Sequence, residues 1–365
     1  MSNVAIDARM INHSGIGTHL RGLLEGFALS KTPPTFTLLG DPPALAAWEM
    51  CARHELVSYT AKIYSLGEQL HFPFRQLRGK VLHSPHYNVP VLRQKRLAVT
   101  VHDLIHLLFP EVLNSSLKSA YARFLMNAVK RRATRIIAVS ENTRRDLIER
   151  LGIKPERIRV IHNAISESFK AEDDEVRIRQ LSAQLSLPAE YLLAVGIDKP
   201  HKNLARLIEV LAALWQSKRL ALPLVIVGVD PARSALPKLA ADLRAADKVH
   251  FVAPAGYGEM PVIYQRARAL IFPSLYEGFG LPVLEAQAVG TPVAASNAAS
   301  LPEVAGEGAL FFSPTDQEGM GYQITKLVED ESVRARLRST GLENIKRFSW
   351  RESARQTLEV YAECE

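Results

Sequence analysis

Short runs of strand-forming residues alternate with segments of helical periodicity along the whole chain, which has 365 residues. This alternation is typical of α/β proteins, in which a parallel sheet carries helices on both faces. Six such runs fall in each half of the chain, so two Rossmann-like domains fit the pattern better than one large sheet. The predicted strands are residues 4–7, 36–39, 81–83, 97–101, 135–139 and 159–161, then 191–195, 224–227, 249–252, 269–272, 292–295 and 309–312.

A polar stretch near the middle of the chain is the best candidate for a linker between the two domains. It runs from Ser166 to Asp174. Its acidic end, residues 172–175, is interpreted as the start of the following helix and not as a metal site, because acidic side chains favour a helix N-terminus. We therefore expect one domain at residues 1–168 and a second at residues 169–347.

The composition indicates globular domains without membrane-spanning segments. Mean hydropathy is close to zero, and no stretch of about 18 uncharged apolar residues is present. The first residues form a predicted strand instead of a signal sequence. Because only Cys51 and Cys364 are present, we expect a cytoplasmic protein with neither a disulfide framework nor a cysteine-based metal site.

Positive charge is concentrated in the first half of the chain. Residues 1–170 contain 24 Lys+Arg and 13 Asp+Glu, a net charge of +11, whereas the remainder has 21 and 25, a net charge of −4. This excess favours an anionic partner, such as a lipid diphosphate or the inner face of the plasma membrane. Nucleic acid is not expected, since the basic clusters lack a recognition motif and stacking aromatic residues.

Two glutamates eight positions apart frame the most informative motif, Glu277-Gly-Phe-Gly-Leu-Pro-Val-Leu-Glu285. The motif follows the apolar run 269–273 and precedes a short helix, for which Pro282 suits the first position and Gly290 the end. Backbone N–H groups at a helix N-terminus form an anion site. Carboxylates accept hydrogen bonds from sugar hydroxyls, so the segment suits a sugar attached to a phosphate.

This segment resembles the signature of the family-4 glycosyltransferases, which are retaining enzymes of the GT-B fold. The matching residues are 274–286, with the two glutamates, and the following Gly-Thr-Pro at 290–292. The resemblance implies two Rossmann-like domains whose parallel sheets face a central cleft. It also implies that the C-terminal segment 348–365 is a helix packed on the first domain, and Ser349 and Glu352 have the spacing of a capping box for it.

The resemblance also implies roles for residues of the motif. Glu277 would contact the donor sugar as a catalytic residue, and Glu285 would bind the ribose hydroxyls. The backbone amides between them would approach the sugar and the diphosphate, at Phe279, Gly280 and Leu281.

A glycine-containing loop follows the first predicted strand. Gly15 and Gly17 precede a segment of helical periodicity, where glycine permits a close approach of backbone and ligand. A dinucleotide fingerprint fits poorly, because Leu20 occupies the third glycine position. Family-4 enzymes have a similar loop that faces the donor phosphates, which implies donor binding here; a purely conformational role for the two glycines is the alternative.

His102 closes an apolar strand, where α/β proteins place ligand-facing residues. A structural hydrogen bond is the simpler interpretation of an isolated histidine. Many family-4 enzymes have His-Asp at this point, however, and the resemblance implies that His102 reaches the transferred sugar as a catalytic residue. His83, His86 and His106 are close in sequence, but no Asp or Glu completes a zinc pattern, so no metal site is expected.

The second half of the chain begins its first helix after Pro200-His201-Lys202-Asn203. Lys202 suits a diphosphate as a point charge. Family-4 enzymes usually add an arginine, and here Ile197 or His201 stands at its position. We therefore expect donor binding by Lys202 with His201, and a pH dependence of donor binding between pH 5.5 and 8 if His201 must be protonated.

The sequence therefore predicts a retaining hexosyltransferase that needs no cofactor or metal ion. The Gly-Ile-Gly loop at 15–17 and the run at 200–203 resemble the branch rich in bacterial mannosyltransferases of surface polysaccharide synthesis, which implies GDP-mannose as donor and a glycan or lipid-linked glycan as acceptor. Two alternatives share the fold: a catalytically silent partner subunit that binds sugar nucleotides, and a sugar-nucleotide epimerase or hydrolase. A nicotinamide dehydrogenase is disfavoured by the broken fingerprint.

Overall fold

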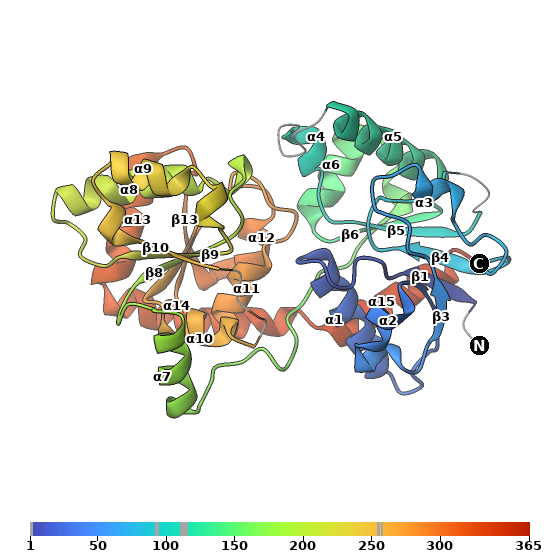
Figure 1. Cartoon of the computed structure of the whole chain (residues 1–365), viewed down its shortest axis with the longest axis horizontal. Coiled ribbons are helices and arrows are strands. Elements are labelled where there is room, and N and C mark those ends of the chain that lie inside the picture. The colour runs from blue at the N-terminus through green and yellow to red at the C-terminus, as the bar shows by residue number, and fades with distance from the viewer. Residues whose placement is uncertain (1–2, 92–94, 110–115, 254–255, 257) are drawn as a thin grey trace. The chain divides into compact units, whose positions relative to one another are not determined.

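The computed structural model describes residues 3–91, 95–109, 116–253, 256 and 258–365. The chain divides into two compact units, one formed by residues 1–164 with 348–365 and the other by residues 165–347. Each unit is a parallel sheet covered by helices (Figure 1). The predicted fold class, two Rossmann-like α/β domains, is confirmed.

The first unit contains a seven-stranded sheet in the order β3-β2-β1-β4-β5-β6-β7. One strand, Glu55–Ser58, is missing from the prediction, because it is an edge strand whose residues are exposed or half-buried and form no apolar run. The strands are β1 Val4–Asp7, β2 Thr37–Gly40, β3 Glu55–Ser58, β4 Val81–Ser84, β5 Leu97–Val101, β6 Arg135–Ala138 and β7 Ile158–Val160.

Helices cover the first sheet and include one from the C-terminal end of the chain. They are α1 Ile16–Ala28, α2 Pro42–Ala46, α3 Gly67–Leu70, α4 Ile105–Leu108, α5 Ser116–Arg132, α6 Glu141–Leu151 and α15 Trp350–Ala362. The last helix packs on α1, where Gly22 and Gly26 leave room for Trp350. A side chain at either glycine would collide with Trp350, so the two helices approach closely.

The second unit contains a six-stranded sheet in the order β10-β9-β8-β11-β12-β13. The strands are β8 Leu192–Val195, β9 Leu224–Val227, β10 Val249–Val252, β11 Ala269–Phe272, β12 Val293–Ser296 and β13 Ala309–Phe312. Its helices are α7 Glu175–Gln184, α8 Leu204–Gln216, α9 Leu236–Asp242, α10 Met260–Arg266, α11 Leu281–Ala288, α12 Leu301–Ala305, α13 Gln317–Glu329 and α14 Glu331–Asn344.

Two helix starts test the sequence patterns directly. Asp174 caps α7 and accepts a hydrogen bond from the N–H of Val176 at 2.8 Å, which confirms that the acidic run begins a helix. The capping box at α15 is wrong in detail. Ser349 stands at the cap position, but its side chain makes no capping bond, and Glu352 pairs with Arg355.

The buried strands explain why both sheets are parallel and doubly covered. Most strands are runs of valine, isoleucine, leucine and alanine that are buried on both faces, as expected when helices lie above and below. The connections change direction between β1 and β4 in the first sheet, and between β8 and β11 in the second. Loops at such a switch point, beyond the carboxyl ends of the strands, are where α/β proteins bind ligands.

No helix among the described residues is both long enough and apolar enough to span a membrane.

Candidate active site

In the second unit, the loops that follow β8 and β11 bring together two charged residues named from the sequence. Nζ of Lys202 donates to Oε1 of Glu277 at 2.7 Å. Both side chains are mostly buried, 17% and 10% exposed. The two strands flank the switch point of the sheet, so the ion pair occupies the position where ligands bind this kind of fold.

Lys202 is held in place by the backbone around it. It ends a single 3-10 turn, Pro200–Lys202, and the next residue, Asn203, has a left-handed backbone with φ of 58°. The Asn203 amide donates to the carbonyls of Pro273 and Pro314 at 3.1 and 2.9 Å. Asparagine tolerates this backbone conformation, and its side chain ties the Lys202 turn to the end of β11.

The glycine-rich segment after Glu277 is fixed by one serine and one glycine. The hydroxyl of Ser300 donates to the carbonyls of Glu277 and Phe279 at 2.9 and 2.8 Å. Gly280 caps α11 with φ of 104°, and a Cβ atom there would lie 2.6 Å from Leu301. Only glycine fits at position 280, because of the left-handed backbone and the nearby Leu301 side chain. The helix starts at Leu281, one residue earlier than predicted.

Glu285 lies on α11, one turn after its start. Its Oε2 accepts a hydrogen bond from the hydroxyl of Tyr264 at 2.6 Å. Burial raises the pKa of Glu285, and this hydrogen bond partly offsets the increase. The carboxyl group is therefore desolvated and oriented, as a hydrogen-bond acceptor for a ligand must be.

His201 precedes Lys202 and is 5% exposed. Its backbone carbonyl accepts the N–H of Leu275 at 2.7 Å, which joins the turn to the loop after β11. The residue thus lies within the same loop pair as the ion pair.

In the first unit, the two glycines of the loop after β1 have different structural requirements. Gly15 caps α1 with φ of 59°, and a Cβ atom there would meet nothing within 4 Å. At Gly17 a Cβ atom would lie 2.5 Å from the carbonyl oxygen of Ile11 and 2.9 Å from that of Met10. Packing within its own loop is therefore sufficient to require glycine at position 17.

His102 lies at the end of β5 beside a second histidine that sequence reasoning missed. Its Nε2 donates to the carbonyl of Pro85 at 2.9 Å. The ring of His19 stands edge-on to it, with centroids 4.8 Å apart, and Nδ1 of His19 pairs with Oδ1 of Asn163 at 2.7 Å. Burial lowers the pKa of His19 to about 4 and that of His102 well below its ordinary value. Both rings are neutral at pH 7.

His83 and His86, two other histidines of the first unit, are paired with neighbouring side chains. His83 is fully buried and pairs with the hydroxyls of Tyr361 and Thr100 at 2.7 and 2.9 Å. Nδ1 of His86 pairs with Oδ1 of Asn88 at 2.5 Å. Within the described ranges, no group of three His, Cys, Asp or Glu residues is arranged to hold a metal ion.

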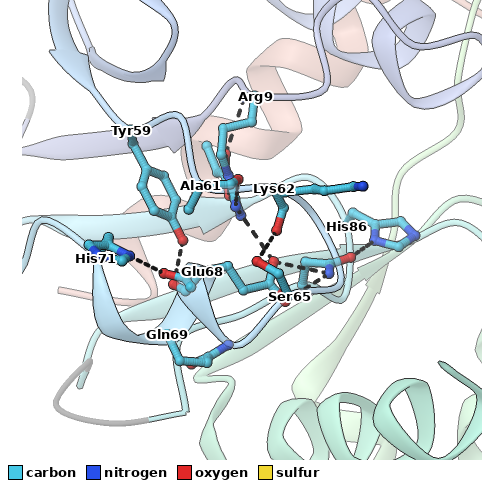
Figure 2. A network of polar contacts seen from close by, with 12 residues as sticks. Arg9, Tyr59, Ala61, Lys62, Ser65, Glu68, Gln69, His71 and His86 are labelled. Atoms are coloured by element: carbon cyan, nitrogen blue, oxygen red, sulfur yellow. Dashed lines mark hydrogen bonds and ion pairs between the residues drawn. The ribbon is translucent and has the colours of Figure 1, made fainter. Parts of the chain in front are cut away.

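A pocket of about 1040 Å³ opens beyond β1, β2 and β3, and Arg9 lies in its wall. The Arg9 guanidinium pairs with Asp7 at 2.6 Å and with Glu68 at 3.5 Å, and stacks 4.0 Å from the centre of the Tyr59 ring (Figure 2). Asp7 and Glu68 raise the pKa of Arg9 against the effect of burial. The other lining residues are Met10, His13, Asp41, Thr60, Ala61, Lys62, Ile63, Tyr64 and Ser65.

Sequence reasoning missed this charged cluster, although Asp7 ends an apolar strand and Arg9 follows it. Charged residues at the carboxyl end of a parallel strand were the available signal. Glu68 could not be found, because its partners are far from it in sequence.

Each unit therefore offers a distinct chemistry. The second unit presents a cation, two carboxylates and the N-terminus of α11, which together match a phosphate group next to hydroxyl groups. The first unit presents neutral histidines and a pocket with polar and aromatic walls.

Two family models match consecutive parts of the chain. The model described as "Glycosyltransferase Family 4" matches residues 14–169. The model described as "Glycosyl transferases group 1" matches residues 179–343.

Curated relatives and solved structures agree with these models. The chain is 30% identical over 239 residues to the O-antigen chain mannosyltransferase RfbU of Salmonella typhimurium, covering 66% of this chain and 62% of that protein, less than two thirds of its length. It is 28% identical over 288 residues to O-antigen chain mannosyltransferase B of Escherichia coli, covering 79% and 75%. The structure of Anabaena HepE in complex with UDP and glucose superposes with a TM-score of 0.78 at 18% identity, covering 98% and 99%, which shows a shared fold.

Proposed function

Because the chain belongs to the family-4 glycosyltransferases, which have the GT-B fold, we propose that it transfers a hexose from a nucleoside diphosphate sugar to a hydroxyl group of a glycan or lipid-linked glycan. The ion pair of Lys202 and Glu277 beside the N-terminus of α11 carries this proposal. This ion pair places a cation that can bind a phosphate next to a carboxylate that can accept hydrogen bonds from sugar hydroxyls.

The proposed reaction breaks the bond between the anomeric carbon and the diphosphate, and forms a bond from that carbon to the acceptor oxygen. Lys202 and the α11 N-terminus stabilise the charge on the leaving diphosphate. Glu277 orients the sugar with His102, and Glu285 accepts hydrogen bonds from the ribose. The departing phosphate oxygen accepts the acceptor proton on the same face, so the configuration is retained. These groups supply the positive charge, and we propose that no metal ion is required.

The donor is proposed to be GDP-mannose. Support comes from the names of RfbU and the Escherichia coli relative, both O-antigen chain mannosyltransferases. The acceptor is proposed to bind the first unit, where the pocket beside Arg9 offers aromatic and polar walls to a saccharide. A cytoplasmic enzyme acting at the inner face of the plasma membrane fits a lipid-linked acceptor.

A thermal-shift panel of GDP, UDP, ADP and dTDP, with their sugars, tests the donor. A nucleotide that binds the folded protein raises Tm by mass action. At a concentration of 100 times its Kd, it adds about 2.7 kcal/mol to the free energy of unfolding. We expect GDP and GDP-mannose to produce the largest shifts. If no nucleotide shifts Tm, the proposed site is wrong; a shift with UDP alone would replace mannose transfer with another hexosyl transfer.

Turnover assays separate the proposed enzyme from its alternatives. Transfer to a lipid-linked oligosaccharide, with the anomeric configuration of the product determined by NMR, should show retention and should persist in EDTA. Donor binding without turnover would indicate a silent partner subunit. Donor consumption at the same rate without acceptor would indicate an epimerase or hydrolase.

A further inference from the structure

His19 is almost fully buried and nevertheless carries an unpartnered polar atom. The side chain lies in the first turn of α1, is 5% exposed, and its Nδ1 pairs with Oδ1 of Asn163 at 2.7 Å. A carbonyl oxygen only accepts, so Nδ1 carries the proton and Nε2 keeps its lone pair. Nε2 is buried and makes no hydrogen bond with any described residue. Because an unpaired buried polar atom costs stability, its presence calls for a reason other than folding.

The ring of His19 is fixed against two other rings of the first unit. It stands edge-on to the ring of His102, with centroids 4.8 Å apart and planes at 85°. It also stands edge-on to the ring of Trp350 on α15, with centroids 5.8 Å apart and planes at 70°. Both Trp350 and Asn163 are buried. A packed and hydrogen-bonded ring cannot turn freely, so His19 forms a rigid wall for His102.

His102 is held at several points and leaves one ring nitrogen available. Its Nε2 donates to the carbonyl of Pro85 at 2.9 Å, and its backbone carbonyl accepts the hydroxyl of Thr143 at 3.1 Å. The other nitrogen, Nδ1, therefore carries the lone pair of the neutral ring, and in the described part of the chain it has no hydrogen-bond partner. His102 is half-buried, so a hydroxyl group can reach Nδ1 while the ring keeps this orientation.

We propose that His19, locked by Asn163, is a positioning residue that keeps the His102 ring turned so that Nδ1 of His102 accepts a hydroxyl of the transferred sugar. The inference rests on the proposed function, because it adds a second residue to the placing of the donor sugar. His19 acts through His102 and does not itself bind the substrate.

The charge state of His19 matters to this arrangement. A proton on Nε2 would turn that nitrogen into a donor, which would compete with the sugar hydroxyl for the lone pair of His102. Burial lowers the pKa of His19 to about 4, so the ring is neutral at pH 7. Among the described residues, its titratable neighbours are His83 on β4 and His102 on β5, whereas α15 contributes Trp350 and the segment after β7 contributes Asn163.

The variant His19→Asn separates the ring from its hydrogen bond. Asparagine can still donate to Asn163, because its amide nitrogen takes the place of Nδ1, but it offers no ring to His102. With saturating donor and acceptor, kcat should fall by about 10- to 100-fold, since a positioned group that moves by about 1 Å can cost 100-fold in rate. The nucleotide-induced rise in Tm should stay unchanged, because Lys202 and Glu285 lie in the second unit.

NMR of the imidazole nitrogens in the ligand-free protein gives a readout that does not depend on transfer. The unaltered chain should show only the Nε2–H form of His102. The His19→Asn variant should show both tautomers, because the ring of His102 is free to turn.

The variant Asn163→Asp keeps the shape of the wall and changes its charge. A carboxylate in place of the amide raises the pKa of His19, so Nε2 gains a proton as pH falls. At saturating donor, which removes any contribution of His201 to donor binding, kcat of this variant should fall about tenfold for each pH unit below the raised pKa. The kcat of the unaltered chain should be constant between about pH 5.5 and 7.5, since burial keeps its His19 neutral there.

The matched control is His54→Asn, at a histidine of the first unit whose Nδ1 pairs with the N–H of Phe36 at 3.2 Å. It should leave kcat and the NMR signals of His102 unchanged. An unaltered chain that transfers no sugar would contradict the proposed function and this inference with it. In a chain that does transfer, normal kcat in His19→Asn or a flat kcat profile in Asn163→Asp would overturn this inference alone. If His19→Asn does not fold, Asn163→Asp decides.

Discussion

At the scale of single residues, the proposed donor site of the second unit contains a mostly buried charge pair. Lys202 and Glu277 are mostly buried, and burying two charges costs solvation that the pair only partly recovers. The pair is therefore weak evidence for a stabilising role. In the proposed complex, a diphosphate would offer Lys202 a more strongly charged partner and leave Glu277 to accept hydrogen bonds from the sugar.

Replacing Lys202 should damage transfer far more than folding. Lys202→Ala removes the cation at the leaving diphosphate, so kcat/KM should fall by about 100- to 1000-fold, the usual cost of losing one group that stabilises developing charge. Lys202→Arg keeps the charge and should retain more activity. Steady-state kinetics with the donor identified by thermal shift measure both effects.

A lysine on the exposed surface of the same unit provides the control for this experiment. Lys238, on α9, pairs with Asp242 at the surface, and Lys238→Ala should leave kcat/KM within about twofold, as surface substitutions usually do. Loss of activity in Lys202→Ala together with a collapse of Tm would indicate a structural role and would contradict the proposed one.

Glu285 should matter to the nucleotide and not to the folded state. Glu285→Ala removes the proposed acceptor for two ribose hydroxyls, and each such hydrogen bond contributes about 0.5–1.5 kcal/mol, or about 1.5–3 kcal/mol when the acceptor is charged, so the nucleotide-induced rise in Tm should largely disappear. Burial raises the pKa of Glu285, so the folded state disfavours its ionised form. Because glutamine is neutral and similar in shape, Glu285→Gln should leave the Tm of the ligand-free protein nearly unchanged. Glu318 is exposed, and Glu318→Ala is the control, which should keep the nucleotide-induced rise in Tm. If this rise in Tm persists in Glu285→Ala, the ribose assignment is wrong.

Individual residues also show which contacts a sequence predicts. Lys202 and Glu277 were identified because each follows a recognisable strand, and the fold brings the ends of β8 and β11 together. The contact of Arg9 with Glu68 spans 59 positions and has no local pattern. At Ser349, the capping-box spacing was present, but Glu352 lies near Arg355, one turn away, and pairs with it instead. Local spacing cannot decide between competing partners.

At the scale of elements, the short helix α11 depends on its capping glycine. Gly280 has φ of 104°, and a Cβ atom would lie 2.6 Å from Leu301. Gly280→Ala should therefore destabilise the second unit by about 2–3 kcal/mol, from backbone strain and overpacking together. It should also weaken nucleotide binding, because the helix N-terminus would shift.

Urea unfolding, with and without nucleotide, measures both effects of Gly280→Ala. Gly290 is the control for backbone strain alone, since it has φ of 75° but a Cβ atom there would meet nothing within 4 Å. Gly290→Ala should cost about 1 kcal/mol and leave nucleotide binding unchanged. Equal losses in the two variants would rule out a special requirement at the α11 cap.

Strands that are buried on both faces were predicted more accurately than an exposed edge strand. Strands such as β5 and β9 are continuous apolar runs buried on both faces, and their predicted bounds match the structure. β3 was missed because an edge strand needs no second buried face, and Glu55-Leu-Val-Ser58 carries polar residues at both ends. The segment is a strand because it pairs with β2, and the residues of the segment alone do not indicate that pairing.

At the scale of the whole molecule, both sheets and the family were predictable. The alternation of strands and helices and the Glu277–Glu285 motif are each visible in short segments of the sequence.

The first unit contains a set of buried neutral histidines, which no sequence motif predicts. Burial lowers the pKa of His19 to about 4, and that of His83 and of His86 to about 3, from an ordinary value of 6.5.

These histidines should make the first unit sensitive to acid. Between pH 6.5 and 4 the unfolded chain binds protons at these side chains and the folded chain does not, so the free energy of unfolding falls as pH falls and is constant above about pH 7. Each unit of pKa shift corresponds to about 1.4 kcal/mol, which gives an upper limit of roughly 2–3 kcal/mol per histidine at pH 4.5. Urea unfolding at several pH values measures the slope.

The fluorescence of the first unit can be followed alone, because Trp48 and Trp350 belong to it and Trp215 belongs to the second unit. In a Trp215→Phe background, His83→Asn should reduce the loss of stability between pH 6.5 and 4.5 by about 2 kcal/mol, whatever its effect at pH 7.5. The exposed His71 is the control, and His71→Asn should leave the pH dependence unchanged. A first unit whose unfolding free energy stays constant down to pH 4.5 would mean that water reaches these rings, and that they are not held neutral by burial.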